Sequence, residues 1–281
     1  MQPHGEARTA LLRQSSPGRR REHVRIYIHT DLEGISGVDC IEMMARDHAR
    51  HQEALENLMH DLNAAVDGAF AGGATHVTVL DSHGGGGNFL LEMLDPRAEN
   101  DTKPNGRWWG IMDESYQGTL FIGAHAMAGT MNGFLDHTQS SLSWYSYSVN
   151  GRRMGELAQW GIVAGHFGIP MLMVSGDERA CVEAHEFFQP LETAVVKRGL
   201  GRNRAELVDL AKARSRIREA AQRAMALVGK AKPFTPTKPM EIRLEVTRAD
   251  YADGAQDREG VERIDARTLR KVTSCGLDLF P

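Results

Sequence analysis

The chain has 281 residues, of which 41% are hydrophobic and 25% are charged, a composition typical of a folded globular protein rather than a fibrous or disordered one. Its formal net charge of -4 and isoelectric point near 6.3 argue against a nucleic-acid or membrane binder, because such proteins usually carry a basic surplus. Three separated cysteines, Cys40, Cys181 and Cys275, favour neither a disulfide framework nor a cysteine zinc site, so a reducing cytoplasm fits best.

Residues 1–23 are rich in arginine and lack the periodicity of a helix or strand, which predicts a disordered N-terminal extension. Arg19, Arg20 and Arg21 are not followed by the apolar segment that an export signal requires. No apolar run approaches the roughly 20 residues that span a membrane. We therefore expect a cytoplasmic protein with neither membrane nor nucleic acid as a partner.

Residues 24–200 alternate between apolar segments typical of strands and segments with the periodicity of helices. The expected strands are Val24–Asp31, Thr75–Leu80, Gly118–Gly123, Pro170–Ser175 and Ser143–Val149, the last turning at Asn150-Gly151. The expected helices are Glu42–Phe70, a short one at Phe89–Leu94, and Glu156–Phe167. This alternation predicts an α/β domain with a mostly parallel sheet sandwiched by helices.

Residues 201–281 predict a smaller α+β part. Asn203 and Glu206 resemble a capping box that opens a long helix over 205–228. A proline-rich stretch, 233–239, then leads to an alternating strand at Met240–Thr247, with which 261–264 and 268–272 are expected to pair.

Several of the expected strands end in residues that bind metals. Asp31 and Glu33 are two residues apart after the first strand, so their side chains share a face of an extended chain. Asp81 and His83 follow the second strand, and further polar residues, His125 and Asp177, follow two later ones. Because ligands gather at the carboxyl ends of parallel strands, this shared edge predicts a metal site better than any one residue does.

Each of these residues also has a structural interpretation. A strand-end acid or histidine is often satisfied by backbone groups, and Asp177 either orients a ligand histidine or only ends a strand. His48 and His51 are expected on a solvated helix face. The four tryptophans, Trp108, Trp109, Trp144 and Trp160, could line a substrate pocket or a subunit contact, with core or interface packing as the default. Gly84–Gly87 lack the lysine of a phosphate loop but would allow the backbone to approach a substrate.

Five motifs together resemble the zinc-dependent D-aminopeptidases. In order along the chain they are Asp31-Leu32-Glu33-Gly34-Ile35-Ser36-Gly37, Asp81-Ser82-His83, Gly123-Ala124-His125-Ala126, Gly155-Glu156-Leu157 and Leu172-Met173-Val174-Ser175-Gly176-Asp177. The resemblance spans residues 25–197 and extends more loosely to residue 272. The set is specific, although each motif alone is weak.

The resemblance implies a role for each site residue. Asp31 would bridge two zinc ions, Glu33 and His83 would complete one, and His125 and Glu156 the other. His137 would be the general base or the group that stabilises the transition state. Carboxylates and imidazoles are zinc ligands where cysteine is not used, although Glu156 is also favoured simply by the N-terminal end of a helix.

The expected function is a cytoplasmic di-zinc aminopeptidase that acts on short peptides, with D-configured residues suggested by the family. The family also implies a ring-shaped homo-oligomer, in its fullest form a decamer. Residues 274–281 depart from the final helix of the relatives, which puts this assembly in question. Two alternatives stay open: another binuclear hydrolase (an amidase or a phosphoesterase), and a metal-stabilised ring or binding protein without turnover.

Overall fold

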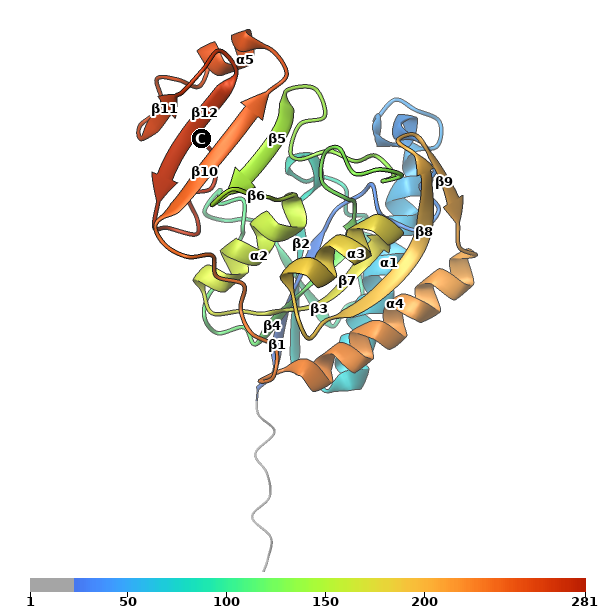
Figure 1. Cartoon of the computed structure of the whole chain (residues 1–281). Coiled ribbons are helices and arrows are strands. Elements are labelled where there is room, and N and C mark those ends of the chain that lie inside the picture. Colours follow the sequence, from blue (N-terminus) through green and yellow to red (C-terminus); the bar gives the residue numbers. More distant parts are fainter. Residues whose placement is uncertain (1–22) are drawn as a thin grey trace, which may run out of the picture.

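Seven strands form a large sheet in the order β3-β2-β1-β4-β7-β8-β9 (Figure 1), in a computed structural model that describes residues 23–281. The strands are β1 (Arg25–Thr30), β2 (His76–Asp81), β3 (Ala98–Asp101), β4 (Gly118–Ala124), β7 (Met171–Asp177), β8 (Glu192–Gly201) and β9 (Arg204–Leu207). All neighbouring pairs are parallel except β8 and β9. Every residue of β4 and β7 is buried, which explains why their sequences are mostly apolar and do not alternate with polar residues.

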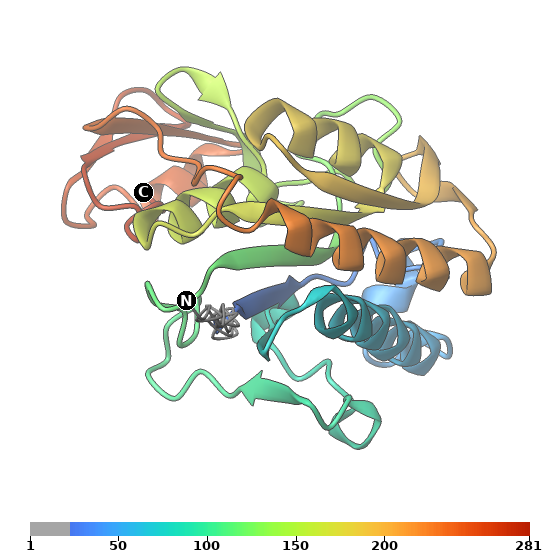
Figure 2. The same ribbon diagram turned by 90° about the horizontal axis from the view of Figure 1, so that it is seen from below.

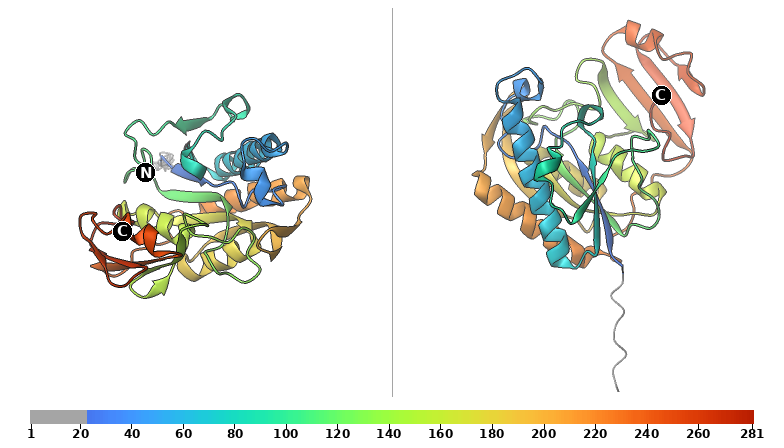
Figure 3. Two further views of the ribbon diagram at one scale, coloured as in Figure 1. Left: turned by 90° about the horizontal axis from the view of Figure 1, so that it is seen from above. Right: turned by 180° about the vertical axis from the view of Figure 1, so that it is seen from behind.

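Helices cover both faces of this sheet. On one face α1 (His51–Gly72) and α4 (Leu210–Ala224) lie side by side and share a core with Ile26 and Ile28 of β1 (Figures 2 and 3). On the other face α2 (Glu156–His166) and α3 (Glu178–Phe187) pack in a second core with Tyr27. Alternate residues of β1 thus enter opposite cores, as a strand between two helical layers requires.

A second, antiparallel sheet has the order β11-β12-β10-β5-β6. Its strands are β5 (Trp144–Val149), β6 (Arg152–Arg153), β10 (Met240–Val246), β11 (Val261–Arg263) and β12 (Thr268–Thr273), and a short α5 (Ala249–Asp253) lies beside them (Figure 1). The expected turn at Asn150-Gly151 joins β5 to β6, with positive φ angles of 51° and 78°. The expected pairing of β10 with β12 is confirmed. The expected pairing of 261–264 with β10 is wrong, because β11 pairs with β12 on the outer side of the sheet.

Two helix starts were predicted wrongly. The helix expected from Glu42 begins at His51, after a 3-10 turn at Ile41–Met44, because Ala45 between them is extended. The capping box at Asn203 does not exist. The Asn203 side chain accepts from the Ile41 amide instead, and Glu206 lies in β9. Asp209 caps α4 by accepting from the Lys212 amide at 3.0 Å.

The remaining short elements are 3-10 turns at His83–Gly85, Leu91–Met93 and Met225–Leu227. The short helix expected at 89–94 is present only as the 3-10 turn Leu91–Met93. The pattern did not predict β3, β8, β9 or α3. The expected disordered extension at 1–23 lies almost wholly outside the described residues, and no helix within 23–281 is both long and apolar enough to cross a membrane.

The division of the chain into a domain at 24–200 and a smaller part at 201–281 stays a prediction. In the packing, α4 from the C-terminal part joins the core of the large sheet. Conversely, β5 and β6 from the middle of the chain complete the second sheet. The segment after β12 folds back onto the second core, where Leu279 is buried and Tyr147 donates to its carbonyl at 2.9 Å.

Candidate metal centre

Side chains from three neighbouring strands meet at one edge of the large sheet. Asp31 directly follows β1, His83 lies two residues after β2, and His125 directly follows β4. Because β1 pairs in parallel with both β2 and β4, the carboxyl ends of the three strands adjoin. Glu156, the first residue of α2, reaches the same edge.

Asp31, Glu33 and His83 form a first cluster whose potential ligand atoms all lie within 4.8 Å of one another. His83 Nε2 is 3.4 Å from Glu33 Oε1. Asp31 and Glu33 are buried, and His83 is partly exposed. The predicted sharing of one face by the two acids is consistent with this arrangement.

His125, His137 and Glu156 form a second cluster on the same 4.8 Å criterion. Glu156 Oε1 is 3.4 Å from His125 Nε2 and 3.6 Å from His137 Nε2. His137 lies in the long connection between β4 and β5, where no strand pattern predicts its position; the family resemblance alone placed it in this centre.

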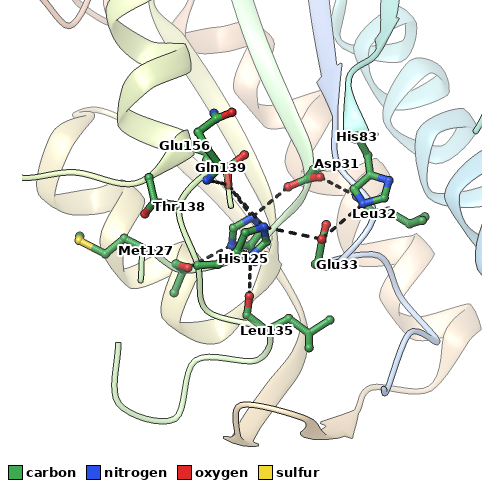
Figure 4. Close-up of polar contacts among 12 residues, drawn as sticks. Asp31, Leu32, Glu33, His83, His125, Met127, Leu135, Thr138, Gln139 and Glu156 are labelled. Carbon is green, nitrogen blue, oxygen red and sulfur yellow. Dashed lines mark hydrogen bonds and ion pairs between the residues drawn. The ribbon is translucent and has the colours of Figure 1, made fainter. Parts of the chain in front are cut away.

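The two clusters adjoin (Figure 4). Asp31 Oδ2 of the first cluster is 3.3 Å from His125 Nε2 of the second. Glu33 Oε1 is 3.9 Å from His137 Nε2. Asp31 therefore lies between the clusters, in the position that a carboxylate bridging two ions would occupy.

The residues present fit a pair of bound cations. Asp31 Oδ2, Glu33 Oε2 and His125 Nε2 are buried without a hydrogen-bond partner. Burying such atoms, and especially carboxylates, without a partner carries a large free-energy cost. Carboxylate oxygen and imidazole nitrogen form a donor set that zinc accepts. Bound cations would satisfy all three atoms.

Main-chain carbonyls orient two of the imidazole rings. His125 Nδ1 lies 3.0 Å from Ala126 O, and His137 Nδ1 lies 2.8 Å from Leu135 O. A carbonyl can only accept, so Nδ1 donates in both rings. In a neutral ring the lone pair then lies on Nε2, which points into the centre.

In the absence of a cation, the pKa values of Asp31, His83 and His125 are raised, so these side chains bind protons more readily. Burial, with Glu33 adjacent, raises the pKa of Asp31 to about 7. Burial opposes charge on His83, but Glu33 outweighs it and raises the His83 pKa to about 9. Burial also opposes charge on His125, yet Asp31 and Glu156 raise its pKa well above the ordinary value. Cations would therefore compete with protons for these groups.

The loop after β1 is held by a close backbone approach. A Cβ atom at Gly34 would lie 2.1 Å from Ala124 O, so only glycine fits there. The Gly34 amide donates to Gly123 O at 2.8 Å. This contact brings the loop that carries Asp31 and Glu33 against the end of β4, which carries His125.

Lys197 supports the same loop from beneath, and sequence analysis missed it. Its side chain is fully buried, and its Nζ donates to Glu33 O and Val38 O, both at 2.7 Å. Burial lowers its pKa to about 7. The sequence did contain a hint of this role, because Lys197 directly follows the apolar run Ala194-Val195-Val196. A lysine in a buried strand seldom lacks a partner.

Asp177 and Asp81 have structural roles. Asp177 caps α3 by accepting from the Arg179 amide, and its other oxygen accepts from the Gly199 amide at 3.0 Å. Among residues 23–281 its side chain accepts from main-chain amides and from no histidine, which fits the strand-end alternative rather than the orienting role. Asp81 accepts from the main-chain amide of Asn88 at 2.6 Å and so closes the loop that contains Gly84–Gly87. These four glycines all have positive φ angles.

The other singled-out side chains lie mostly outside the centre. His51 Nδ1 contacts Met43 O at 2.8 Å, and neither His48 nor His51 belongs to a metal cluster within residues 23–281. Trp160 is buried on α2, where packing was expected, yet it also faces the cavity described next.

A cavity of about 370 Å³ opens onto the metal centre. Its walls include five of the six predicted site residues, all except His125, together with residues that the sequence did not single out as functional. The latter are His29, Ser82, Lys103, Gln139, Gln159 and Phe280, and the aromatic wall also contains Trp108 and Trp160. The main-chain amide of Gln139 donates to Glu156 Oε1 at 2.6 Å and so helps to fix that carboxylate.

A family model described as D-aminopeptidase matches residues 24–280. The chain belongs to the D-aminopeptidase family. This family member is 32% identical over 242 residues to a D-aminopeptidase of Bacillus subtilis (strain 168), a match that covers 85% of this chain and 87% of that protein. The resemblance expected from the five motifs is confirmed, and the chain is a metallopeptidase.

The fold of this D-aminopeptidase family member also matches a solved structure. That structure is the Zn-dependent D-aminopeptidase DppA from Bacillus subtilis, described as a self-compartmentalizing protease. The TM-score is 0.86 at 29% identity, and the match covers 91% of this chain and 94% of the other. The predicted α/β architecture is therefore confirmed, while the individual roles of the six site residues stay predictions.

Proposed function

We propose that the chain is a di-zinc aminopeptidase that removes the N-terminal residue of short peptides, with a preference for D-configured residues. One observation carries the two-metal part of this proposal. Two clusters of ligand-type side chains adjoin at the floor of one cavity, and Asp31 lies 3.3 Å from His125 of the neighbouring cluster. The name of the Bacillus relatives supports the choice of zinc and of a D-aminopeptidase substrate.

The side chains have distinct tasks in this proposal. Asp31 holds both ions, Glu33 and His83 complete one site, and His125 and Glu156 complete the other. Zinc, when bound, supplies a Lewis acid and a hydroxide nucleophile near neutral pH.

The remaining tasks concern the substrate. Glu33 and Glu156 line the cavity, so the free amino group of the substrate would lie beside the metal centre. His137, with Nδ1 held by Leu135 O, presents Nε2 to accept or stabilise a proton during peptide-bond cleavage.

A substrate panel tests this proposal directly. Metal-free protein, reconstituted with one or two equivalents of zinc, is assayed on D-Ala-D-Ala, L-Ala-L-Ala, N-acetyl-D-Ala-D-Ala and a phosphate monoester. The proposal predicts cleavage of the free D-peptide that requires two equivalents of zinc, and no cleavage after N-acetylation. Cleavage of the acetylated peptide would indicate an amidase, cleavage of the ester a phosphoesterase, and no turnover a binding protein.

The same proposal includes assembly into a ring-shaped homo-oligomer in the cytoplasm, in its fullest form a decamer. The description of the matched Bacillus structure as self-compartmentalizing supports an assembly. Met131 and Leu142 are 83% and 76% exposed on a single chain, which suits burial against other subunits. Light scattering coupled to size exclusion would give the number of subunits, and a monomer at micromolar concentration would refute the ring.

A further inference from the structure

Lys103 is the one lysine or arginine that lines the cavity within residues 23–281. The metal centre contributes three acids to the same cavity, Asp31, Glu33 and Glu156. The position of this lysine calls for an explanation, because a positively charged side chain does not bind a metal ion.

The fold fixes the position of Lys103. The residue follows β3 with a φ of 51°, a left-handed conformation that is uncommon outside glycine. Its amide donates to Asp101 Oδ1 at 2.7 Å. Asp101 is itself buried, and its other oxygen accepts from Tyr27 and from the Ile111 amide. A buried hydrogen-bond network therefore places this lysine at the cavity.

The charge of Lys103 is not neutralised by the protein. Its Nζ donates to one main-chain oxygen, Gly85 O, at 3.1 Å. No carboxylate lies within ion-pair distance of it in the described part of the chain. Because an ammonium group has three N–H donors, Lys103 retains donors for an anionic ligand.

The space between Lys103 and the metal centre suits a small molecule that carries a carboxylate at one end. The volume of about 370 Å³ is near the lower limit of ligand pockets, which hold roughly 300 to 1,000 Å³. Trp108 and Phe280, with ring centroids 5.3 Å apart, give the cavity an apolar wall. An apolar wall excludes water and strengthens a charge-assisted hydrogen bond nearby.

We propose that Lys103 binds the C-terminal carboxylate of the substrate, and that the enzyme thereby selects dipeptides and tripeptides with a free C-terminus. This inference rests on the proposed aminopeptidase function. The substrate amino group lies at the metal centre, and the carboxylate at the other end pairs with the lysine. Longer peptides would have to displace this contact.

The test compares D-Ala-D-Ala with its C-terminal amide in the zinc-loaded full-length enzyme and in Lys103→Met. The wild-type enzyme should prefer the free carboxylate by about 10- to 100-fold in kcat/KM, the range for a charge-assisted hydrogen bond. Lys103→Met should lose this preference, because the KM for the free dipeptide rises towards the KM for the amide, and the variant should retain its zinc. Lys230→Met, which alters an exposed lysine, is the matched control and should retain the preference.

Equal loss on both substrates would overturn the inference, because it would show that Lys103 only supports the loop at Gly85. An unchanged preference in Lys103→Met would overturn it as well. If the wild-type enzyme cleaves neither peptide, the proposed function fails, and calorimetry with a non-cleavable aminomethylene dipeptide and its amide decides the role of Lys103. Carboxylate-dependent binding that Lys103→Met abolishes would support it, and binding unaffected by the substitution would refute it.

Discussion

The imidazole rings of His125 and His137 stack with their centroids 4.0 Å apart and their planes only 8° from parallel. Both rings direct Nε2 toward Glu156. Two rings in this relationship cannot both be protonated without strong repulsion. The pair therefore suits one metal ligand beside one neutral base, which is the division proposed for His125 and His137.

Replacing the base should separate chemistry from metal binding. We expect His137→Asn to lower kcat by about 100-fold or more, the usual contribution of a general base, while two zinc ions per chain are retained. Assays of kcat together with elemental analysis check this, and His185→Asn, at an exposed site, serves as the control. A fall to one zinc per chain would assign His137 as a ligand instead.

Replacing the ligands should reveal which carboxylate is shared. Asp31→Ala should abolish both zinc sites, because this side chain lies between the clusters. Glu156→Ala should weaken mainly the site that contains His125. Zinc titration followed by calorimetry measures both variants. Retention of one tight site in Asp31→Ala would show that Asp31 does not bridge.

Lys197 should affect stability more than an exposed lysine does. Lys197→Met leaves the carbonyls of Glu33 and Val38 buried without a donor, and each such group costs about 1 to 3 kcal/mol. We expect a clear fall in the free energy of unfolding, measured by urea denaturation, and weaker zinc binding because the Glu33 loop is released. Lys212→Met, at an exposed site, should change neither. Wild-type stability and zinc affinity in Lys197→Met would contradict this role.

Glu183 should make stability depend on pH. Burial raises its pKa to about 7, and its Oε1 has no hydrogen-bond partner. Between the unfolded value near 4.5 and about 7, the folded state binds more protons, so its contribution to stability is present below pH 4.5 and is lost as the pH rises to about 7.

Glu183→Gln removes this titration. Relative to wild type, the variant should gain thermal stability between pH 5 and pH 8, measured as the difference in Tm at each pH. Glu259→Gln, at an exposed position away from Glu183, should show no such trend. A Tm difference between Glu183→Gln and wild type that is the same at both pH values would refute the account of Glu183.

Sequence patterns predicted the buried parallel strands well, because β4 and β7 carry apolar runs, Leu120–Ile122 and Met171–Val174, that lead into polar residues. The same patterns predicted α4 but misplaced its start, since Asn203 bonds to Ile41, a residue distant in the chain. Nor could they find β8 and β9, which follow no strict alternation.

The candidate centre was partly predictable for the same reason. Asp31, His83 and His125 follow strands, so their convergence follows from parallel pairing. Lys197, Lys103 and the approach of His137 to Glu156 depend on contacts between segments far apart in the sequence. No local period encodes such contacts, and the structure is needed to find them.

An anomalous difference map at the zinc absorption edge, from crystals of the zinc-loaded protein, tests the two-metal centre most directly. We predict two peaks per chain about 3.5 to 4 Å apart, with Asp31 touching both. A single peak, or two peaks that do not share Asp31, would contradict the proposed centre.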